Sequence, residues 1–412
     1  MIDLATLIRP GDGVWWGQGS SEPEPLVGQL FDQVDSLGPV TVFPGLTWND
    51  RFSEELPPNL TVVSYGGLGV LHKVSRGGRL NVIPCHYSAL PRLFATGRLP
   101  SDVALLQVSA PDEDGLVSLG IGVEYAADAL THTPTLIAEI NQRMPRTVGG
   151  PRLPLSAFAA TVETDRPLRE LPDREPTAID RAIAGYVAGL VSDGDTIQMG
   201  IGSLPSAILD ALSGHTDLGI HSGMISDAVL RMIERGVITG AKKEIDPGLA
   251  ITGSAAGTTA LYDRLHQFPV EFRAASYTHS PLVLSQLRTL VSINSAIQVD
   301  LTGQVGSETR DGVYYGAVGG QADFSRAASL TGSLSIIALR SESHGESSIT
   351  TALDRGVVTT TRTDVDAVVT EHGVARLTGC TEAERVRRII EVASPRFREQ
   401  LARSYYERMV TT

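Results

Sequence analysis

One short pattern occurs twice in this chain, 183 residues apart, and it constrains the fold more than any other feature. Residues 11–20 read GDGVWWGQGS and residues 194–203 read GDTIQMGIGS, so both copies contain Gly-Asp, four further residues and Gly-x-Gly-Ser. In the second copy TIQM is typical of a strand, and Pro205 suits the first turn of a following helix. The repeat therefore predicts one α/β unit that is used twice, with each copy beginning near its own glycine-rich turn.

Short apolar runs alternate with helical patterns along the chain. Five runs are typical of buried strands: VTVFPG (40–45), VALLQVS (103–109), LIAEIN (136–141), LSIIAL (334–339) and DAVVTEHG (366–373). Three segments are typical of helices: AIDRAIAGYVAGL (178–190), DAVLRMIERG (227–236) and EAERVRRIIEVA (382–393). This alternation favours mostly parallel sheets covered by helices. Residues 142–176 are rich in proline and arginine and predict a linker, which places the expected domains at residues 1–176 and 177–412.

The composition excludes several classes of function. The net charge is -13 with a pI near 5.2, and no Lys/Arg cluster is large enough to favour nucleic-acid or membrane-surface binding. No window approaches roughly 18 uninterrupted apolar residues, and the N-terminal residues lack the apolar core of a signal peptide. Cys85 and Cys380 are too few for a disulfide framework or, without histidines, for a zinc cluster. We therefore expect a cytoplasmic enzyme that holds no metal ion.

The second glycine-rich turn indicates where a ligand binds. Its two glycines let the backbone approach a ligand closely, and free N–H groups at a helix start attract anions. A dinucleotide fold would place a glycine at position 205, where this chain has proline, so we expect no nicotinamide cofactor. An ordinary tight strand-to-helix turn is the alternative interpretation. The predicted cofactor-binding residues here are Gly200, Ile201, Gly202, Ser203 and Leu204.

Two other glycine-rich segments are candidates for the same site. In the first copy of the repeat, Gly17 and Gly19 are predicted to contact substrate and Trp16 to line an acyl pocket. Because side chains alternate along a strand, Trp15 is then expected in the core. Further along, three glycines of YYGAVGGQ (314–321) form a flexible loop able to lie flat against a nucleotide or a pantetheine chain. The predicted binding residues of this loop are Gly316, Gly319, Gly320 and Gln321.

Six longer segments follow one another in the order of a known family: LPSDVALLQVSAPDEDGLVSLGIGVE (99–124), IAEINQRMPRT (137–147), DTIQMGIG (195–202), SINSAIQVDLTGQV (292–305), GAVGGQADFSRAA (316–328) and TTTRTDVDAVVTEHGVARLTG (359–379). Through them the chain resembles the acetyl-CoA hydrolase and 4-hydroxybutyrate/butyryl CoA-transferase family over nearly its whole length. The resemblance implies two tandem open, mostly parallel α/β domains with the active site in the cleft between them. It also implies an acyl-CoA substrate, a small carboxylate acceptor, a role in acetate metabolism and a homodimer or larger assembly.

The chain departs from this family at the catalytic position. In such enzymes a glutamate carboxylate attacks the acyl-CoA thioester and gives an acyl-glutamyl anhydride, then a glutamyl-CoA thioester. That glutamate belongs to a segment reading roughly GIHTEM. Here residues 219–227 read GIHSGMISD, which places Gly223 at that position with no carboxylate at 222 or 224. The family's covalent mechanism therefore cannot operate at position 223.

A second departure concerns the expected CoA phosphates. Family members usually carry basic residues in the segment that here reads RSESHGESSITTAL (340–353), and this chain has mainly serine and acidic residues there. Charge-assisted contacts to phosphate would then be lost. Either CoA binds through other groups, with His344 and Gly345 as candidates, or the ligand is a pantetheine thioester on an acyl carrier protein.

Three residues are candidates to replace the missing carboxylate. His279, in YTHSP, is predicted as a general base on water, and a hydrogen-bonded structural histidine is the alternative. Ser222 beside His221 suggests a nucleophile and its base, although neighbours on an extended segment point to opposite faces. Glu308, in GSETRDG, is a relocated carboxylate or a structural residue.

Three functions remain open at this point. The first is an acyl-thioester hydrolase or direct acyl transferase that works without a glutamyl-CoA intermediate. The second is a CoA-transferase with a relocated carboxylate, and the third is a non-catalytic protein that binds acyl-CoA or a carrier-bound thioester. Turnover with water alone distinguishes the first, acceptor-dependent turnover the second, and binding without turnover the third.

Overall fold

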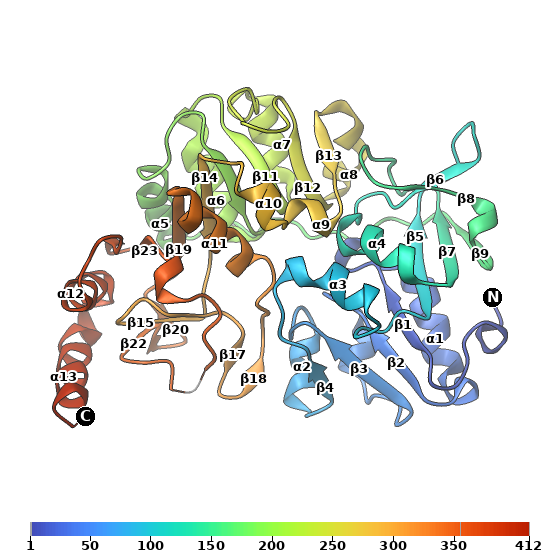
Figure 1. Cartoon of the computed structure of the whole chain (residues 1–412), viewed down its shortest axis with the longest axis horizontal. Coiled ribbons are helices and arrows are strands. Elements are labelled where there is room, and N and C mark those ends of the chain that lie inside the picture. Colours follow the sequence, from blue (N-terminus) through green and yellow to red (C-terminus); the bar gives the residue numbers. More distant parts are fainter. Residues whose placement is uncertain (1, 355, 412) are drawn as a thin grey trace.

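The computed structural model describes residues 2–354 and 356–411. The chain forms two α/β domains, each built on its own twisted sheet (Figure 1). All neighbouring strands of the first sheet run parallel. Across the sheet the order is β4 (Leu80–Val82), β3 (Leu60–Ser64), β2 (Val40–Phe43), β1 (Gly13–Trp16), β5 (Val103–Val108), β7 (Thr135–Asn141) and β9 (Ala160–Thr164).

The second sheet repeats the plan of the first. Its central strand is followed by three strands that lead outward on one side and then by three on the other, as in the first sheet, and an eighth strand is added at that second edge and runs antiparallel. This shared order supports the duplication that the repeated sequence predicts. The order is β13 (Val270–Phe272), β12 (Ala250–Ala255), β11 (Gly219–Ile225), β10 (Thr196–Met199), β14 (Leu290–Asn294), β19 (Leu334–Ala338), β23 (Ala367–Thr370) and β24 (Gly373–Arg376).

Helices connect the parallel strands. The first domain has α1 (Glu24–Leu37), α2 (Leu71–Arg76), α3 (Leu90–Ala95) and α4 (Glu124–Ala129). The second has α5 (Ala178–Ala188), α6 (Ser203–Ala211), α7 (Asp227–Glu234), α8 (Thr259–Arg264), α9 (Ala275–Thr278), α10 (Pro281–Leu284), α11 (Gln321–Thr331), α12 (Glu382–Val392) and α13 (Pro395–Thr411). The strands and helices predicted from apolar pattern are confirmed, each with boundaries within three residues. The fold class, two tandem and mostly parallel α/β domains, is confirmed as well.

Local sequence explains where α5 begins. Thr177 accepts a hydrogen bond from the backbone N–H of Asp180, and the Asp180 carboxylate accepts one from the N–H of Thr177. This reciprocal pair satisfies backbone donors that the first turn of a helix leaves free. Ile183, Ala184 and Val187 then form the buried face of the helix, at helical spacing.

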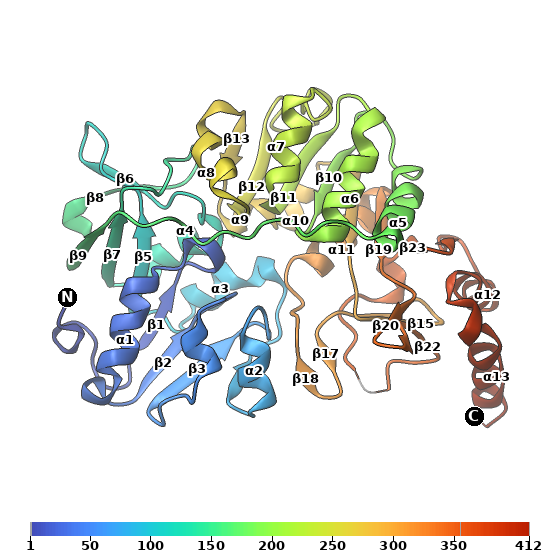
Figure 2. The same ribbon diagram turned by 180° about the vertical axis from the view of Figure 1, so that it is seen from behind.

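The predicted linker is too long. Within residues 142–176, β8 (Arg152–Pro154) pairs with β6 (Leu116–Ser118), and β9 pairs in parallel with β7 of the first sheet. Residues 165–177 contain no helix or strand, and Figure 2 shows this segment crossing the back of the molecule from β9 to α5. The predicted boundary at 176/177 falls at the end of that segment.

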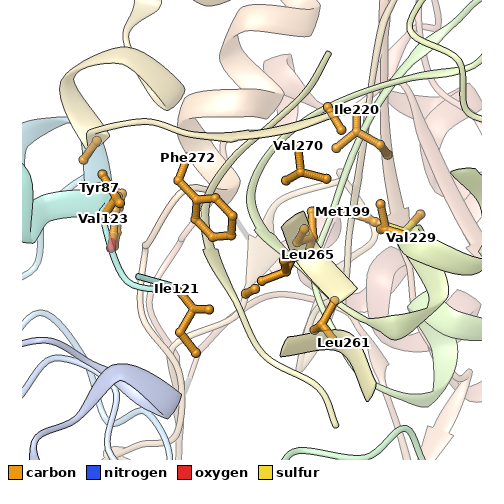
Figure 3. Packing of buried hydrophobic residues seen from close by; sticks show 14 of the residues in the cluster. Tyr87, Ile121, Val123, Met199, Ile220, Val229, Leu261, Leu265, Val270 and Phe272 are labelled. Atoms are coloured by element: carbon orange, nitrogen blue, oxygen red, sulfur yellow. The ribbon is translucent and has the colours of Figure 1, made fainter. Parts of the chain in front are cut away.

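The largest hydrophobic core crosses the boundary between the domains. Ile121 and Val123, which precede α4 in the first domain, belong to the same buried cluster as Met199 and Phe272 of the second (Figure 3). The two domains are therefore held together by apolar packing as well as by the chain that joins them. None of the helices in the described part of the chain combines the length and apolar composition needed to cross a bilayer.

Candidate active site

A cavity of about 290 Å³ lies between the domains, and both copies of the repeated turn line it. The first copy contributes Gln18, and the second contributes Gly200 and Ile201. These turns follow the central strands β1 and β10, where the strand order reverses direction in each sheet. In open α/β sheets this is the place where ligands bind. Other lining residues include Tyr65, Tyr87, Glu124, Gly223, Ser254, His279, Asn294, Ala317, Gly319, Gly320, Gln321 and Phe324.

His279 fills the space that a side chain at position 223 would need. A Cβ atom on Gly223 would lie 2.9 Å from Cε1 and 3.0 Å from Nε2 of the imidazole. The ring also abuts Gly320, where a Cβ would lie 2.5 Å from Nε2. Real Cβ contacts are not this short, so both positions need glycine while the histidine is in place. Sequence reasoning identified Gly223 and His279 separately, and the fold brings them together in the cavity.

His279 has one hydrogen-bond partner among the described side chains, the hydroxyl of Thr278. Nδ1 lies 2.9 Å from the hydroxyl oxygen of Thr278, which donates its own hydrogen to the carbonyl of Ala274 at 3.3 Å. Nε2 is the ring nitrogen that lies toward Gly223 and Gly320. Burial, and to a smaller extent His221, lowers the pKa of His279 to about 3. The imidazole is thus neutral at pH 7 and a weak base.

Glu124 is a carboxyl group in the cavity that sequence reasoning missed. Its Oε2 accepts hydrogen bonds from Tyr87 Oη at 2.6 Å and from Gln18 Nε2 at 2.8 Å. Oε1 is buried and has no hydrogen-bond partner within the described residues. Burial raises the pKa of Glu124 to about 7. Its only sequence signal is its place at the end of the family-like segment 99–124.

Several predicted site residues lie elsewhere. The Ser222 hydroxyl donates to the carbonyl of Met199 at 2.9 Å, whereas His221 Nε2 lies 3.1 Å from the carbonyl of Thr278, so the two do not form a nucleophile and base. Their opposite directions follow from the alternation of side chains along β11. Glu308 is not among the residues that line the cavity. It is buried elsewhere, and its carboxylate accepts a hydrogen bond from the Thr359 hydroxyl at 2.9 Å.

The first glycine-rich turn also differs from the prediction. Trp16 is fully buried in the core, where its ring centroid lies 6.2 Å from that of Phe52. Its predicted place in an acyl pocket is therefore wrong. Gly17 and Gly19 are not among the lining residues of the cavity. Gly19 instead has φ +62° and donates its N–H to Leu46, which shapes the turn that presents Gln18.

A larger cavity, of about 670 Å³, holds other predicted residues. Ser203 and Leu204 line it together with His344, whereas Gly345 lines a separate pocket beside α13. The segment 315–321 runs between the two cavities: Tyr315 lines the larger one, and Ala317 to Gln321 line the smaller one. Gly316 lines neither, and its carbonyl accepts a hydrogen bond from Gly67 at 2.9 Å, which ties this segment to the first domain.

Three arginines line the larger cavity although segment 340–353 carries few basic residues. Arg340 forms a bidentate pair with Asp180, with distances of 2.8–3.0 Å. Arg310 Nη2 lies 3.2 Å from Oε2 of Glu346, and Arg76 donates a hydrogen bond to Tyr315 Oη at 3.1 Å. They come from the end of the β19 segment, from the β17 (Thr309–Arg310) hairpin and from α2. Two of the three arginines therefore reach this cavity from outside segment 340–353, and Arg340 is the first residue of that segment.

Comparisons with known proteins agree with the fold. Residues 2–157 match the acetyl-CoA hydrolase/transferase N-terminal domain, and residues 257–405 match the C-terminal domain of the same name. The 4-hydroxybutyrate coenzyme A transferase of Clostridium kluyveri is 42% identical over 345 residues, which cover 82% of this chain and 80% of that protein.

Two solved structures are similar over 98% of this chain and 96% of theirs. RipA from Yersinia pestis has a TM-score of 0.89 at 31% identity, and the 4-hydroxybutyrate CoA-transferase from Porphyromonas gingivalis has a TM-score of 0.80 at 33% identity. The two matched domains and the level of identity leave one assignment: the chain belongs to the acetyl-CoA hydrolase/transferase family and is an acyl-CoA-processing enzyme.

Proposed function

We propose that this enzyme hydrolyses acyl-CoA thioesters, or passes the acyl group directly to an acceptor, without a glutamyl-CoA intermediate on β11. The observation that carries the proposal is the replacement at position 223. A glycine stands there, and the imidazole of His279 fills the space that a side chain would occupy. No carboxylate at this position can attack the thioester, so water is the simplest acceptor for the acyl group.

The two cavities suggest how acyl-CoA is bound. The nucleotide lies in the larger cavity, where Arg76, Arg310 and Arg340 supply charge for its phosphates. The pantetheine chain follows residues 315–321 toward the smaller cavity, where the thioester meets the turn at Gly200 and Ile201. Backbone N–H groups aimed at a developing oxyanion are typically worth about 3 kcal/mol each. A thioester is already activated, so such donors and a positioned water suffice for its hydrolysis.

Thiol release tests the proposed reaction. A panel of acyl-CoAs is incubated with the enzyme, with and without acetate or succinate, and both free thiol and acyl-CoA masses are measured. Hydrolysis predicts free thiol at the same rate in both sets and no new acyl-CoA. New acyl-CoA that forms only with an acceptor, without net thiol, would overturn hydrolysis.

CoA transfer is the second candidate, and a specific observation favours it. Glu124 places one carboxyl group in the cavity, and a carboxyl group is what the family's covalent mechanism requires. Acceptor-dependent formation of new acyl-CoA in the same experiment would support this candidate. A non-catalytic binding protein would give neither product while still binding acyl-CoA.

Replacing Arg76 by glutamine is expected to lower kcat/KM for acetyl-CoA by roughly 10- to 100-fold and to leave acetyl-pantetheine unaffected. A hydrogen bond to a charged group contributes about 1.5–3 kcal/mol, and pantetheine lacks the nucleotide phosphates. Steady-state kinetics with the two thioesters measure this. Lys73→Gln is the matched control, because Lys73 is on the same helix but donates to Ser53 outside the cavity. An equal loss with both thioesters would place the nucleotide elsewhere.

Three finer assignments belong with this proposal. We place the enzyme in the cytoplasm, as a homodimer or larger assembly, and we retain an acyl carrier protein as an alternative source of the thioester. Wild-type enzyme that turns over acetyl-pantetheine as fast as acetyl-CoA would favour the carrier. Light scattering at several protein concentrations measures the assembly.

A further inference from the structure

Among the described residues that line the smaller cavity, Glu124 is the only one with a carboxyl group. We propose that Glu124 is the catalytic base of this enzyme and takes a proton from the water that attacks the thioester. This inference rests on the proposed hydrolysis. It moves the essential carboxylate from β11 of the second domain, where Gly223 stands, to the start of α4 in the first domain.

The chain before α4 is docked on the strand next to β11. Val123 donates its N–H to the carbonyl of Gly253 at 3.1 Å, and Ala255 donates to the carbonyl of Ile121 at 3.0 Å. A Cβ on Gly253 would lie 3.2 Å from Cβ of Glu124 and 3.0 Å from the carbonyl oxygen of Gly223. Glu124 therefore enters the cavity from the opposite domain but beside the position that lost its carboxylate.

Two hydrogen bonds hold one carboxylate oxygen of Glu124, and neither is made to the other oxygen. Oε2 accepts from Tyr87 and from Gln18, and Gln18 is itself held, because its Oε1 accepts from Tyr65 Oη and from the N–H of Leu46, both at 2.8 Å. Oε1 of Glu124 is buried and has no hydrogen-bond partner of normal geometry among the described residues. The Ser254 hydroxyl is the group beside it: it is directed to the carbonyl of Gly223 at 3.3 Å and is also close enough to Glu124 to lower the pKa of that carboxyl. A base needs this combination of a fixed position and a free oxygen.

The proposed step balances without any further reactant. Glu124 accepts a proton as the oxygen of water bonds to the thioester carbonyl carbon, which gives a tetrahedral intermediate. The intermediate then breaks its C–S bond, and the proton on Glu124 passes to the departing CoA thiolate. The products are the free acid and CoA thiol, and Glu124 returns to its carboxylate form.

The ionisation of Glu124 agrees with this role. Burial raises its pKa to about 7, against the hydrogen bonds from Tyr87, Gln18 and Ser254 that lower it. The titratable groups that face it stay neutral near pH 7, because burial raises the pKa of the tyrosines well above 10 and lowers that of His279 to about 3. These groups are Tyr65, Tyr87, Tyr125 and His279. The carboxylate form therefore grows as pH rises through about 7, and kcat/KM for hydrolysis is expected to rise with it and then level off.

Glu124→Gln is the direct test. We expect kcat for acyl-CoA hydrolysis to fall 10²–10⁴-fold, the usual contribution of a general base, while KM changes less than threefold. The rise of kcat/KM with pH near 7 should disappear from the residual activity. Activity within threefold of wild type, or an unchanged pH profile, would overturn the assignment.

Glu22→Gln is the matched control. Glu22 is also a buried carboxyl whose pKa burial raises to about 7, and it accepts hydrogen bonds from Thr47 and Asn49, but it does not line the cavity. This variant should keep the pH profile and an activity within threefold of wild type. Circular dichroism and thermal unfolding of both variants show whether a loss of activity reflects loss of the fold.

Turnover in ¹⁸O-labelled water separates a base from a nucleophile. A base leaves Glu124 unlabelled in the digested enzyme, whereas label in its peptide would show attack by the carboxylate and overturn the assignment as a base. Acceptor-dependent transfer by wild type, without net thiol release, would overturn hydrolysis and with it a base that acts on water. Hydrolysis that continues at the wild-type rate in Glu124→Gln would overturn the assignment of Glu124 alone.

Discussion

Gly223→Glu is expected to lower hydrolysis about a hundredfold, although it restores the residue that the family uses. The new Cβ would lie 2.9–3.0 Å from the His279 ring. That ring has little room to move. Its centroid lies 4.5 Å from the ring centroid of Tyr87 and 5.0 Å from that of Phe324, and Gly320 abuts it. Displacement of about 1 Å in an active site costs roughly this much in rate. Steady-state thiol release measures the loss.

A second substitution is expected to give the restored glutamate room. In Gly223→Glu/His279→Asn the smaller amide replaces the imidazole, and we expect acceptor-dependent formation of new acyl-CoA, read by mass. Gly223→Ala is the control, since it introduces the same Cβ contact without a carboxylate. Equal transfer by the single and double variants would show that His279 does not obstruct position 223.

Arg166→Met is expected to lower the free energy of unfolding by about 3–5 kcal/mol, because it leaves a fully buried carboxylate without its cation. Arg166 contacts Glu139 through Nε at 2.6 Å and Nη2 at 2.9 Å, and the Glu139 side chain has no exposed area. Urea unfolding followed by circular dichroism measures the change, read from the midpoint at a matched slope.

A neighbouring ion pair provides the control for this loss. Arg143 lies 2.7 Å from Asp165, but both side chains are more than half exposed, and such pairs contribute about 0–1 kcal/mol. Arg143→Met should therefore stay within 1 kcal/mol of wild type. Similar losses in Arg143→Met and Arg166→Met would mean that burial of Glu139 does not determine the effect.

Local pattern predicted most of the fold and failed where strands are not apolar. Strands such as β5, buried at every position, and helices such as α5, with its capping pair, carry their signal within a few residues. The edge strand β9 alternates between half-buried and exposed residues and so resembled a linker. An edge strand is stabilised by pairing with its neighbour, here β7, and this pairing is invisible in the local sequence.

The site was predicted only where a motif or a departure from one was visible. Gly223, Gly200 and Ile201 belong to such motifs, whereas Ser203 and Leu204 line the larger cavity and Gly202 lines neither. Glu124 has no comparable signal, because its partners Gln18 and Tyr87 lie 106 and 37 residues away in sequence. The arginines of the larger cavity also converge from separate segments. Contacts of this range depend on how the two domains pack.

The equivalent strand order of the two sheets has a consequence for how such enzymes diverge. Glu124 begins the helix between β5 and β7, and Gln321 begins the helix between β14 and β19, so the two residues occupy corresponding places in an ancestral half and both face the cavity. A duplicated gene of this kind leaves a pocket with two sides of common descent. With Glu124 as the proposed base, a reactive group lost from one side would be supplied from the other, with neither sheet rebuilt.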